Sequence, residues 1–227
     1  CMYRNSSCPP ILSHPNIEVV YADCLNLEEL DLAMQEVKYA YYLIHSMREK
    51  NNEFVQKDKI AARNFREAAK RYGVQRIIYL GGLGEKNDKM SPHLQSRREV
   101  GQILSQGSVP VIRLRAAIII GTGSASYELM KALILNNRFI PFLPKFNSQC
   151  QPIAIRDVIK CLIGILETPD LESSVYPIGC KNILTYKEMI QKFAKIFNRN
   201  VRFVDVSWIP FPVKFMFRVY AYWLHFF

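Results

Sequence analysis

A histidine and an arginine four residues apart are the side chains of this sequence whose types and spacing could do chemistry. His93 and Arg97 stand in the segment S-P-H-L-Q-S-R-R-E-V-G, and this spacing places two side chains on one helix face. Histidine exchanges a proton near neutral pH, and arginine is a fixed cation that can hold a phosphate or a ribose. We expect either acid–base chemistry by His93 or two exposed residues in a helix that begins at Ser91 and Pro92.

Two apolar runs flank this segment and must position it. Q-R-I-I-Y-L-G-G-L-G precedes it and V-P-V-I-R-L-R-A-A-I-I-I-G-T-G follows it. Both runs are rich in β-branched residues and end in glycines, which is typical of buried parallel strands joined by a crossover helix. The sequence therefore predicts one βαβ unit over residues 75–126, with a site where its strands end.

The rest of the chain alternates strand-like and helix-like segments. We expect strands at 1–4, 16–21, 39–44, 151–155 and 201–206, with 39–44 buried, and helices at 26–37, 52–72, 127–135, 157–168 and 185–198. Asn26 and the Thr185/Glu188 pair are signals of a helix start, and Gly73 is a signal of a helix end. This alternation predicts an α/β fold with a Rossmann-like, doubly wound, mostly parallel sheet.

Composition narrows the class of protein. With 227 residues, 49% of them hydrophobic, the chain can bury a substantial core. Its six cysteines show no C-x-x-C pairing and no histidine at ligand spacing, so we expect no metal site and reduced thiols in the cytoplasm. The net charge of +10 favours an anionic partner, but the basic residues fall on helix-like segments and no nucleic-acid-binding module is present. Nucleic acid is therefore not an expected partner.

Both ends of the sequence are abrupt. It begins Cys-Met-Tyr-Arg, so we expect a piece of a longer protein. Residues 208–227 are rich in aromatic side chains but are interrupted by Pro210, Pro212, Lys214 and Arg218. Because charges and prolines disfavour a membrane span, we expect a helix that docks on the core or on a membrane surface.

The motifs together resemble those of a known family. Their order is Y-A-D-C-L, A-Y-Y-L-I-H-S-M, I-I-Y-L-G-G-L-G, S-P-H-L-Q-S-R-R-E-V-G, R-L-R-A-A-I-I-I-G-T-G-S-A-S and Q-P-I-A-I-R-D-V. This set is similar to the atypical short-chain dehydrogenases/reductases, and more narrowly to their NAD(P)H-binding, NmrA-like and epimerase-like branch. The resemblance covers nearly the whole chain. It implies a Rossmann-like NAD(P)-binding domain at 1–170, a small, truncated α+β substrate lobe at 171–227, and NADP as cofactor, with NAD as the alternative.

The resemblance also assigns roles on the adenine side of the cofactor. It places Arg4 against the NADP 2′-phosphate, although a solvated arginine is the alternative. It brings Asp23, with Cys24 beside it, to the adenine amino group, although an aspartate there could instead cap a turn. Ile44, His45 and Ser46 fall at the carboxyl end of a strand, where His45 would contact ribose or pyrophosphate or else be a structural histidine.

On the nicotinamide side the sequence departs from the family pattern. The resemblance implies that Ala116, Ala117 and Ile118 line this side and that Gly81 and Gly82 border it. The family places Tyr-x-x-x-Lys where this chain has His93 and Arg97, and it places Ser or Thr where this chain has Gly81-Gly82. The catalytic assignment of His93 and Arg97 therefore depends on their spacing alone.

A larger departure is at the start of the fold. The family opens with a strand and a G-x-x-G-x-x-G turn that approaches the pyrophosphate, and no such glycine cluster precedes Gly73. In the strand order 3-2-1-4-5-6 the first strand is central, so its absence would leave two unpaired edges. Either the two halves of the sheet close on each other, or another segment fills the gap, or the natural protein is longer, which we favour.

Three functions remain open at this point. The first is an NAD(P)-dependent oxidoreductase or epimerase-like enzyme acting on a small or lipid-like carbonyl or hydroxyl compound. The second is a non-catalytic NmrA-like module that senses dinucleotides. The third is an inactive fragment of the family.

Overall fold

The computed structural model describes residues 1–4, 14–44, 53–83, 91–142 and 144–205. The chain forms two compact units that interleave in sequence. The first contains Cys1–Arg115 and Cys161–Pro177, and the second contains Ala116–Lys160 and the chain from Ile178 onward.

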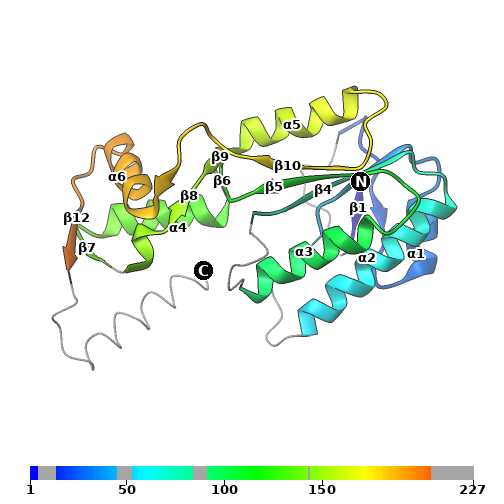
Figure 1. The fold of residues 1–227 in the computed structure, drawn as a ribbon, viewed down its shortest axis with the longest axis horizontal. Coiled ribbons are helices and arrows are strands. Elements are labelled where there is room, and N and C mark those ends of the chain that lie inside the picture. The colour runs from blue at the N-terminus through cyan, green and yellow to red at the C-terminus, as the bar shows by residue number, and fades with distance from the viewer. Residues whose placement is uncertain (5–13, 45–52, 84–90, 143, 206–227) are drawn as a thin grey trace. The chain divides into compact units, whose positions relative to one another are not determined.

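The first unit is built on a four-stranded sheet. Its strands are β3 (Tyr39–Tyr42), β4 (Arg76–Gly82), β5 (Val111–Ala116) and β10 (Ser174–Ile178), in the order β10-β5-β4-β3. Strands β3 and β4 are parallel, with Tyr39 opposite Arg76 and Tyr42 opposite Tyr79. Helices α1 (Leu27–Ala33), α2 (Glu53–Arg71) and α3 (Pro92–Leu104) lie on one side of this sheet, and the C-terminal half of α5 (Ile155–Glu167) lies on the other (Figure 1). This layering confirms the predicted α/β, Rossmann-like fold class.

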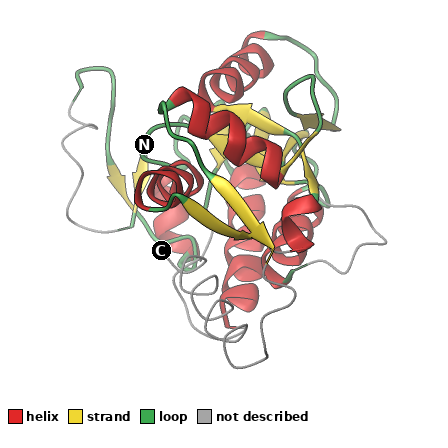
Figure 2. Ribbon diagram, turned by 90° about the vertical axis from the view of Figure 1, so that its left-hand side faces the viewer, coloured by secondary structure: helices red, strands yellow, loops and turns green. Residues whose placement is uncertain are grey.

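Two further strands of the first unit stand apart from this sheet. Strand β1 (Met2–Tyr3) pairs in parallel with β2 (Val20–Tyr21), and these two form a sheet of their own. Figure 2 shows this pair, next to the label of the N-terminus, separate from the larger sheet. Within the described residues, β3 therefore pairs on one side only. The structure thus shows the gap that the order 3-2-1-4-5-6 predicts when its central strand is missing.

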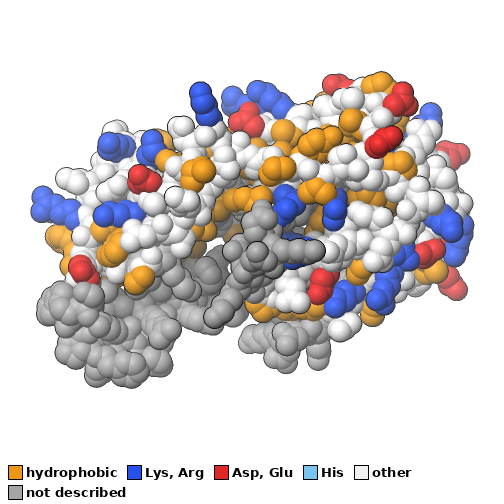
Figure 3. Space-filling model, in the orientation of Figure 1, with side chains coloured by type: hydrophobic (Ala, Val, Ile, Leu, Met, Phe, Trp, Pro, Cys, Tyr) orange, Lys and Arg blue, Asp and Glu red, His pale blue; other side chains and the backbone are white. Residues whose placement is uncertain are grey.

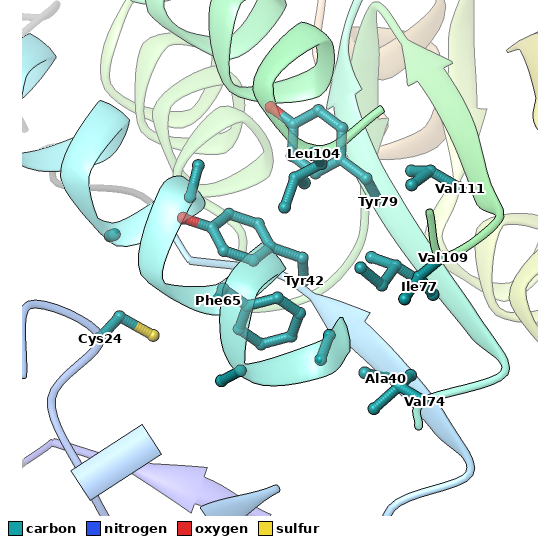
Figure 4. Packing of buried hydrophobic residues seen from close by; sticks show 14 of the residues in the cluster. Cys24, Ala40, Tyr42, Phe65, Val74, Ile77, Tyr79, Leu104, Val109 and Val111 are labelled. Carbon is teal, nitrogen blue, oxygen red and sulfur yellow. The ribbon is translucent and has the colours of Figure 1, made fainter. Parts of the chain in front are cut away.

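An aromatic group forms the centre of the first unit's core. The Tyr42 ring packs edge-on against Phe65 of α2 at 4.9 Å and against Tyr79 of β4 at 5.8 Å between centroids. Cys24 and Leu104 belong to the same buried cluster (Figure 4). The α2-facing side of the sheet is therefore sealed by alternate residues of each strand, as a half-buried pleat requires.

The opposite side of β3 is only partly covered, which corrects the prediction of a buried strand at 39–44. Tyr39, Tyr41 and Leu43 are 40%, 38% and 53% exposed, and they alternate with the buried Ala40 and Tyr42. Residue-by-residue alternation is the pattern of a strand covered on one face only. Figure 3 shows apolar side chains exposed among the charged ones on one face of the molecule, and Ile163 of α5 is among the exposed large hydrophobic residues of the first unit.

Arg76 ties α5 to the sheet. Its side chain is buried, and its Nη1 donates to the carbonyl oxygens of Ile165 at 2.6 Å and Thr168 at 2.8 Å. The guanidinium also lies over the Tyr39 ring, 5.8 Å from its centroid. A cation at the C-terminal end of a helix satisfies unpaired carbonyl groups and complements the helix dipole. The Tyr41 hydroxyl donates to the carbonyl of Leu162 at 3.0 Å and adds a second anchor.

The second unit is made of short strand pairs and two helices. Strands β6 (Ile118–Ile120) and β9 (Pro152–Ala154) are parallel, as are β7 (Phe139–Phe142) and β12 (Arg202–Asp205), whereas β8 (Gln149–Cys150) and β11 (Leu184–Thr185) are antiparallel. Helices α4 (Ala125–Asn136) and α6 (Tyr186–Ile196) pack together around Ile134, Ile140 and Ile190, next to the 3-10 turn η2 (Pro144–Asn147).

The predictions made from local sequence signals can be compared with the structure. The helix-start signals at Asn26 and at Thr185/Glu188 are confirmed, with a complete capping box at the second, and Gly73 has the positive φ of a helix-terminating glycine. The strand expected in the apolar run after Val109 is present as β5, which ends at Ala116. The rest of the run forms the separate strand β6, which pairs with β9. The aromatic segment 208–227 lies outside the described residues, and within those residues no helix is long and apolar enough to cross a bilayer.

Candidate functional site

The candidate site lies at the carboxyl end of β4, where α3 begins. Ser91 caps this helix, its Oγ accepting from the Leu94 N–H at 3.4 Å, and Pro92 occupies the first turn. Both residue types suit these positions, because a serine oxygen satisfies a free N–H and proline has none to satisfy. The predicted helix start at Ser91 and Pro92 is confirmed, and it sets where His93 and Arg97 emerge.

His93 is exposed, and its ring stacks on the buried Phe54 of α2. The ring centroids are 4.8 Å apart and the planes are inclined by 24°. Stacking of this kind restricts the imidazole to a small range of orientations while leaving its nitrogen edge accessible. The structure therefore places His93 as a surface residue with a defined ring orientation.

Arg97 lies one helical turn further along and is partly buried. Its backbone carbonyl accepts a hydrogen bond from the Tyr79 hydroxyl at 2.7 Å. Burial raises the pKa of Tyr79, and the nearby Arg97 guanidinium offsets part of this rise. The phenol therefore stays protonated and acts as a donor that fixes α3 on β4.

Gly81 and Gly82 are required by packing at this point. A Cβ atom on Gly82 would lie 2.7 Å from Leu94 Cδ2 and 3.5 Å from Arg97 Cδ, and one on Gly81 would lie 2.9 Å from Tyr79 Cε1. Contacts under 3.0 Å force a neighbouring atom to move. A serine or threonine at position 82, the residue types that the resemblance leads one to expect, would need a different Leu94 rotamer.

A buried hydrogen bond holds α3 on the side that faces α2. The Ser96 Oγ donates to Asp58 Oδ2 of α2 at 2.8 Å, and the two residues are only 1% and 6% exposed. A buried carboxylate is costly unless it accepts hydrogen bonds. Together with the Tyr79 contact, this pair fixes the rotation of α3 and thus the direction in which His93 and Arg97 point.

Asp23 and Cys24, which the resemblance places on the adenine side, lie in a turn that follows β2. Asp23 Oδ1 accepts from the Leu25 N–H at 2.9 Å, which is the turn-capping role left open by the sequence. Asn64 of α2 holds the same turn by donating to the carbonyl oxygens of Cys24 at 3.0 Å and Leu25 at 3.1 Å. Burial, with the adjacent Asp23 charge, raises the pKa of Cys24 to about 12, so its thiol is an inert core group.

The remaining predicted residues are spread over the molecule. Arg4 is exposed and directly follows β1, and Ile44 is partly buried against the core just after β3. His45 and Ser46 lie outside the described residues. Ala116, Ala117 and Ile118 belong to the second unit. The first unit therefore brings together Gly81, Gly82, His93 and Arg97 at one place.

The sequence did not single out four supporting residues of this site, namely Phe54, Asp58, Tyr79 and Ser96. Three of them carried a signal, because a polar side chain within an apolar strand or on the inner face of a helix is unusual and indicates a buried partner. Phe54 carried none, since its ring contact joins two helices far apart in sequence.

Part of the chain matches a known protein family. Residues 1–111 match the model of the NAD(P)H-binding family. A search of curated proteins gives no significant match.

Solved structures of similar fold come from nucleotide-sugar enzymes. Bordetella bronchiseptica WbmG, crystallised with NAD and UDP, is 13% identical at a TM-score of 0.71, over 89% of this chain and 71% of that one. UDP-glucuronic acid 4-epimerase from Bacillus cereus, in complex with NAD, is 18% identical at 0.68, over 85% and 70%. UDP-glucose 4-epimerase from Thermotoga maritima, with UDP-glucose, is 12% identical at 0.71, over 90% and 76%.

At these identities the solved structures show the fold alone, and the family model covers residues 1–111. Both agree with the α/β architecture described above. Residues 1–111 match the model of the NAD(P)H-binding family, and the chain shares the Rossmann-like fold of these nucleotide-sugar epimerases.

Proposed function

We propose that this protein is an NAD(P)(H)-binding oxidoreductase or epimerase-like protein, with NADP as the preferred dinucleotide and NAD as the alternative. The observation that carries this proposal is the juxtaposition of Arg97 and Gly82 at the carboxyl end of β4, with His93 on the same face of α3. In doubly wound sheets, ligands bind beyond the carboxyl ends of the strands. The family match and the NAD complexes of proteins with this fold support the same assignment.

The described residues fit a dinucleotide in part. On the adenine side, Arg4 would meet a 2′-phosphate and Asp23 the adenine amino group, since one Asp23 oxygen is engaged by the Leu25 N–H and a carboxylate has a second. Ile44, His45 and Ser46 would follow the ribose and pyrophosphate. The 227-residue sequence offers no glycine-rich turn for the pyrophosphate itself, so we derive no reaction step through the cofactor.

On the nicotinamide side, Gly81, Gly82, Ala116, Ala117 and Ile118 would border the ring. The division into a cofactor domain at 1–170 and a substrate lobe at 171–227 is part of the same proposal. So are a cytoplasmic location and contact of the aromatic segment 208–227 with a membrane surface. The substrate would be a small carbonyl or hydroxyl compound.

For catalysis we propose that His93 donates or accepts the proton and that Arg97 holds a ribose or phosphate oxygen. The proton would move between an imidazole nitrogen and the substrate oxygen, and the Phe54 stack would keep the ring in place. His93→Gln removes the exchangeable charge but retains a polar side chain, so turnover should fall at least about tenfold. Phe54→Leu keeps His93 but removes the ring on which it stacks, so it tests the effect of ring orientation alone. Unchanged turnover in His93→Gln would exclude proton transfer by His93.

A second candidate is a non-catalytic NmrA-like module that senses the dinucleotide. The observation that favours it is the crowding at Gly82, where the Leu94 side chain occupies the space that a catalytic serine would need. The two candidates differ in one measurement. Binding of NADPH without hydride transfer to any member of a panel of carbonyl compounds supports the sensor, and hydride transfer supports the enzyme.

A further inference from the structure

The positive charge of this protein is concentrated in its second unit. That unit, Ala116–Lys160 with Ile178–Phe227, contains thirteen lysines and arginines and four acidic residues, which gives a net charge of +9. The first unit contains seventeen lysines and arginines and sixteen acidic residues, a net charge of +1. A charge asymmetry of this size between two parts of a chain favours an anionic partner for the basic part.

The two-stranded ribbon formed by β7 and β12 belongs to this basic unit and has one covered face. Ile140 is only 1% exposed and lies opposite Phe203 in a buried cluster. Successive side chains of a strand point to opposite faces, so the residues on either side of these two belong to the other face. This outer face of the ribbon carries Phe139 opposite Arg202 and Pro141 opposite Val204.

The outer face combines exposed apolar side chains with arginines. Phe139 is 56% exposed and Val204 is 39% exposed, whereas phenylalanine and valine are usually buried. The guanidinium carbon of Arg138 lies 6.0 Å from the centroid of the Phe139 ring. The backbone N–H of Arg202 donates to the Arg138 carbonyl oxygen at 2.9 Å, so two exposed arginines lie beside this ring.

Exposed apolar groups bordered by arginines fit the surface of an anionic bilayer. Acidic headgroups attract the arginines, and aromatic and aliphatic side chains gain free energy by entering the boundary between headgroups and acyl chains. A nucleic acid would also attract the charge. Pro141 and Val204, however, offer neither a hydrogen bond to a base edge nor an aromatic ring on which a base could stack. The combination of charge and aliphatic surface therefore favours lipid.

We infer that the outer face of the β7/β12 ribbon is a docking surface for an anionic membrane. Phe139 and Val204 enter the headgroup region, and the two arginines contact the acidic headgroups around them. This inference does not depend on dinucleotide binding or on catalysis. It goes beyond the membrane contact proposed for segment 208–227, because it assigns a contact to residues outside that segment.

Sedimentation of the full chain with lipid vesicles tests the inference. Vesicles that contain about one third phosphatidylserine should bind the protein at least about tenfold more tightly than vesicles of phosphatidylcholine alone, because each arginine near an anionic surface adds to the attraction. Sodium chloride should reduce this difference, since salt screens the headgroup charge.

Substitutions on the outer face identify the contact. Arg202→Gln should weaken binding to the phosphatidylserine vesicles about fivefold, and Phe139→Ser about tenfold, because the first removes a charge and the second an apolar anchor. Arg63→Gln and Leu32→Ser remove an exposed arginine and an exposed leucine from the first unit and should leave binding unchanged. If Phe139→Ser does not fold, Val204→Ser tests the same apolar contact.

A further variant, Lys214→Gln with Arg218→Gln, separates the ribbon from segment 208–227. Weaker binding in Arg202→Gln and Phe139→Ser supports the inference, whatever this double variant does. Unchanged binding in both ribbon variants would overturn it, and a loss in the double variant alone would leave the contact to segment 208–227. Equal binding to the two kinds of vesicle would also overturn the inference, as would ribbon variants that weaken binding to a mixed-sequence RNA but not to vesicles.

Discussion

The contact between Ser96 and Asp58 should be among the strongest single polar contributions to the stability of α3. The Ser96 hydroxyl donates to a carboxylate at 2.8 Å, and both side chains are almost completely buried. A hydrogen bond to a charged group contributes about 1.5–3 kcal/mol, and a buried carboxylate deprived of a donor also loses solvation. We therefore expect Ser96→Ala to reduce the free energy of unfolding by about 2 kcal/mol. In a protein of this length that lowers the thermal midpoint by about 4–8 °C.

A double-mutant cycle isolates the contact from other effects of each substitution. Urea unfolding of Ser96→Ala, Asp58→Ala and the double variant should give a coupling energy of about 1.5–3 kcal/mol. Ser105→Ala is the matched control, because its hydroxyl makes only a local bond to the Gly101 carbonyl of the same helix. A coupling energy below about 0.5 kcal/mol would refute the reasoning, since contacts without interaction add within that margin.

Three further predictions follow from other parts of the structure. Arg76→Met should reduce the free energy of unfolding by about 3 kcal/mol in urea, because two carbonyl groups at the C-terminal end of α5 lose their charged donor; a loss under 1 kcal/mol would contradict this role. Gly82→Ser should cost about 1–3 kcal/mol through overpacking, and Leu94→Ala in the same chain should recover most of that cost; no recovery would mean that the crowding lies elsewhere. Burial raises the pKa of Cys24 to about 12 and also raises that of Tyr42, so the folded pKa exceeds the unfolded one. The contribution of these two protonated groups to the free energy of unfolding is therefore complete below about pH 9. It is lost as the pH rises toward 12, by up to about 1.4 kcal/mol per pH unit for each group. Urea unfolding from pH 8 to 11 measures this loss, and flat stability over that range would be the contrary result.

Much of the fold could be predicted because local signals and the hydrophobic pattern agree. Asn26, Gly73, Ser91 and the Thr185/Glu188 box each mark a helix end that the structure reproduces, since capping depends on side chains close in sequence. Strand pairing is different, because it depends on segments far apart. The pattern around Ala117 gives no sign that β6 leaves the larger sheet to pair with β9.

The candidate site was predictable in outline only. His93 and Arg97 could be found from their spacing, since four residues is a property of the helix itself. The contacts that surround these two side chains could not be predicted from the sequence. The stack of His93 on Phe54, the crowding of Gly82 by Leu94 and the hydrogen bond from Tyr79 to the Arg97 carbonyl all come from contacts between separate elements. The exposed face of β3 likewise depends on what covers it, which a single strand's sequence does not show.

Dinucleotide binding is the central claim, and titration tests it directly. NADPH and NADH should be titrated into the protein expressed from its whole reading frame, including any coding sequence upstream of Cys1, with nucleotide fluorescence as the readout. We expect saturable binding that is tighter for NADPH, that requires a glycine-rich turn preceding β1, and that weakens when Arg4 is replaced by Gln. No saturable binding of either dinucleotide by a protein that carries such a turn would contradict the claim.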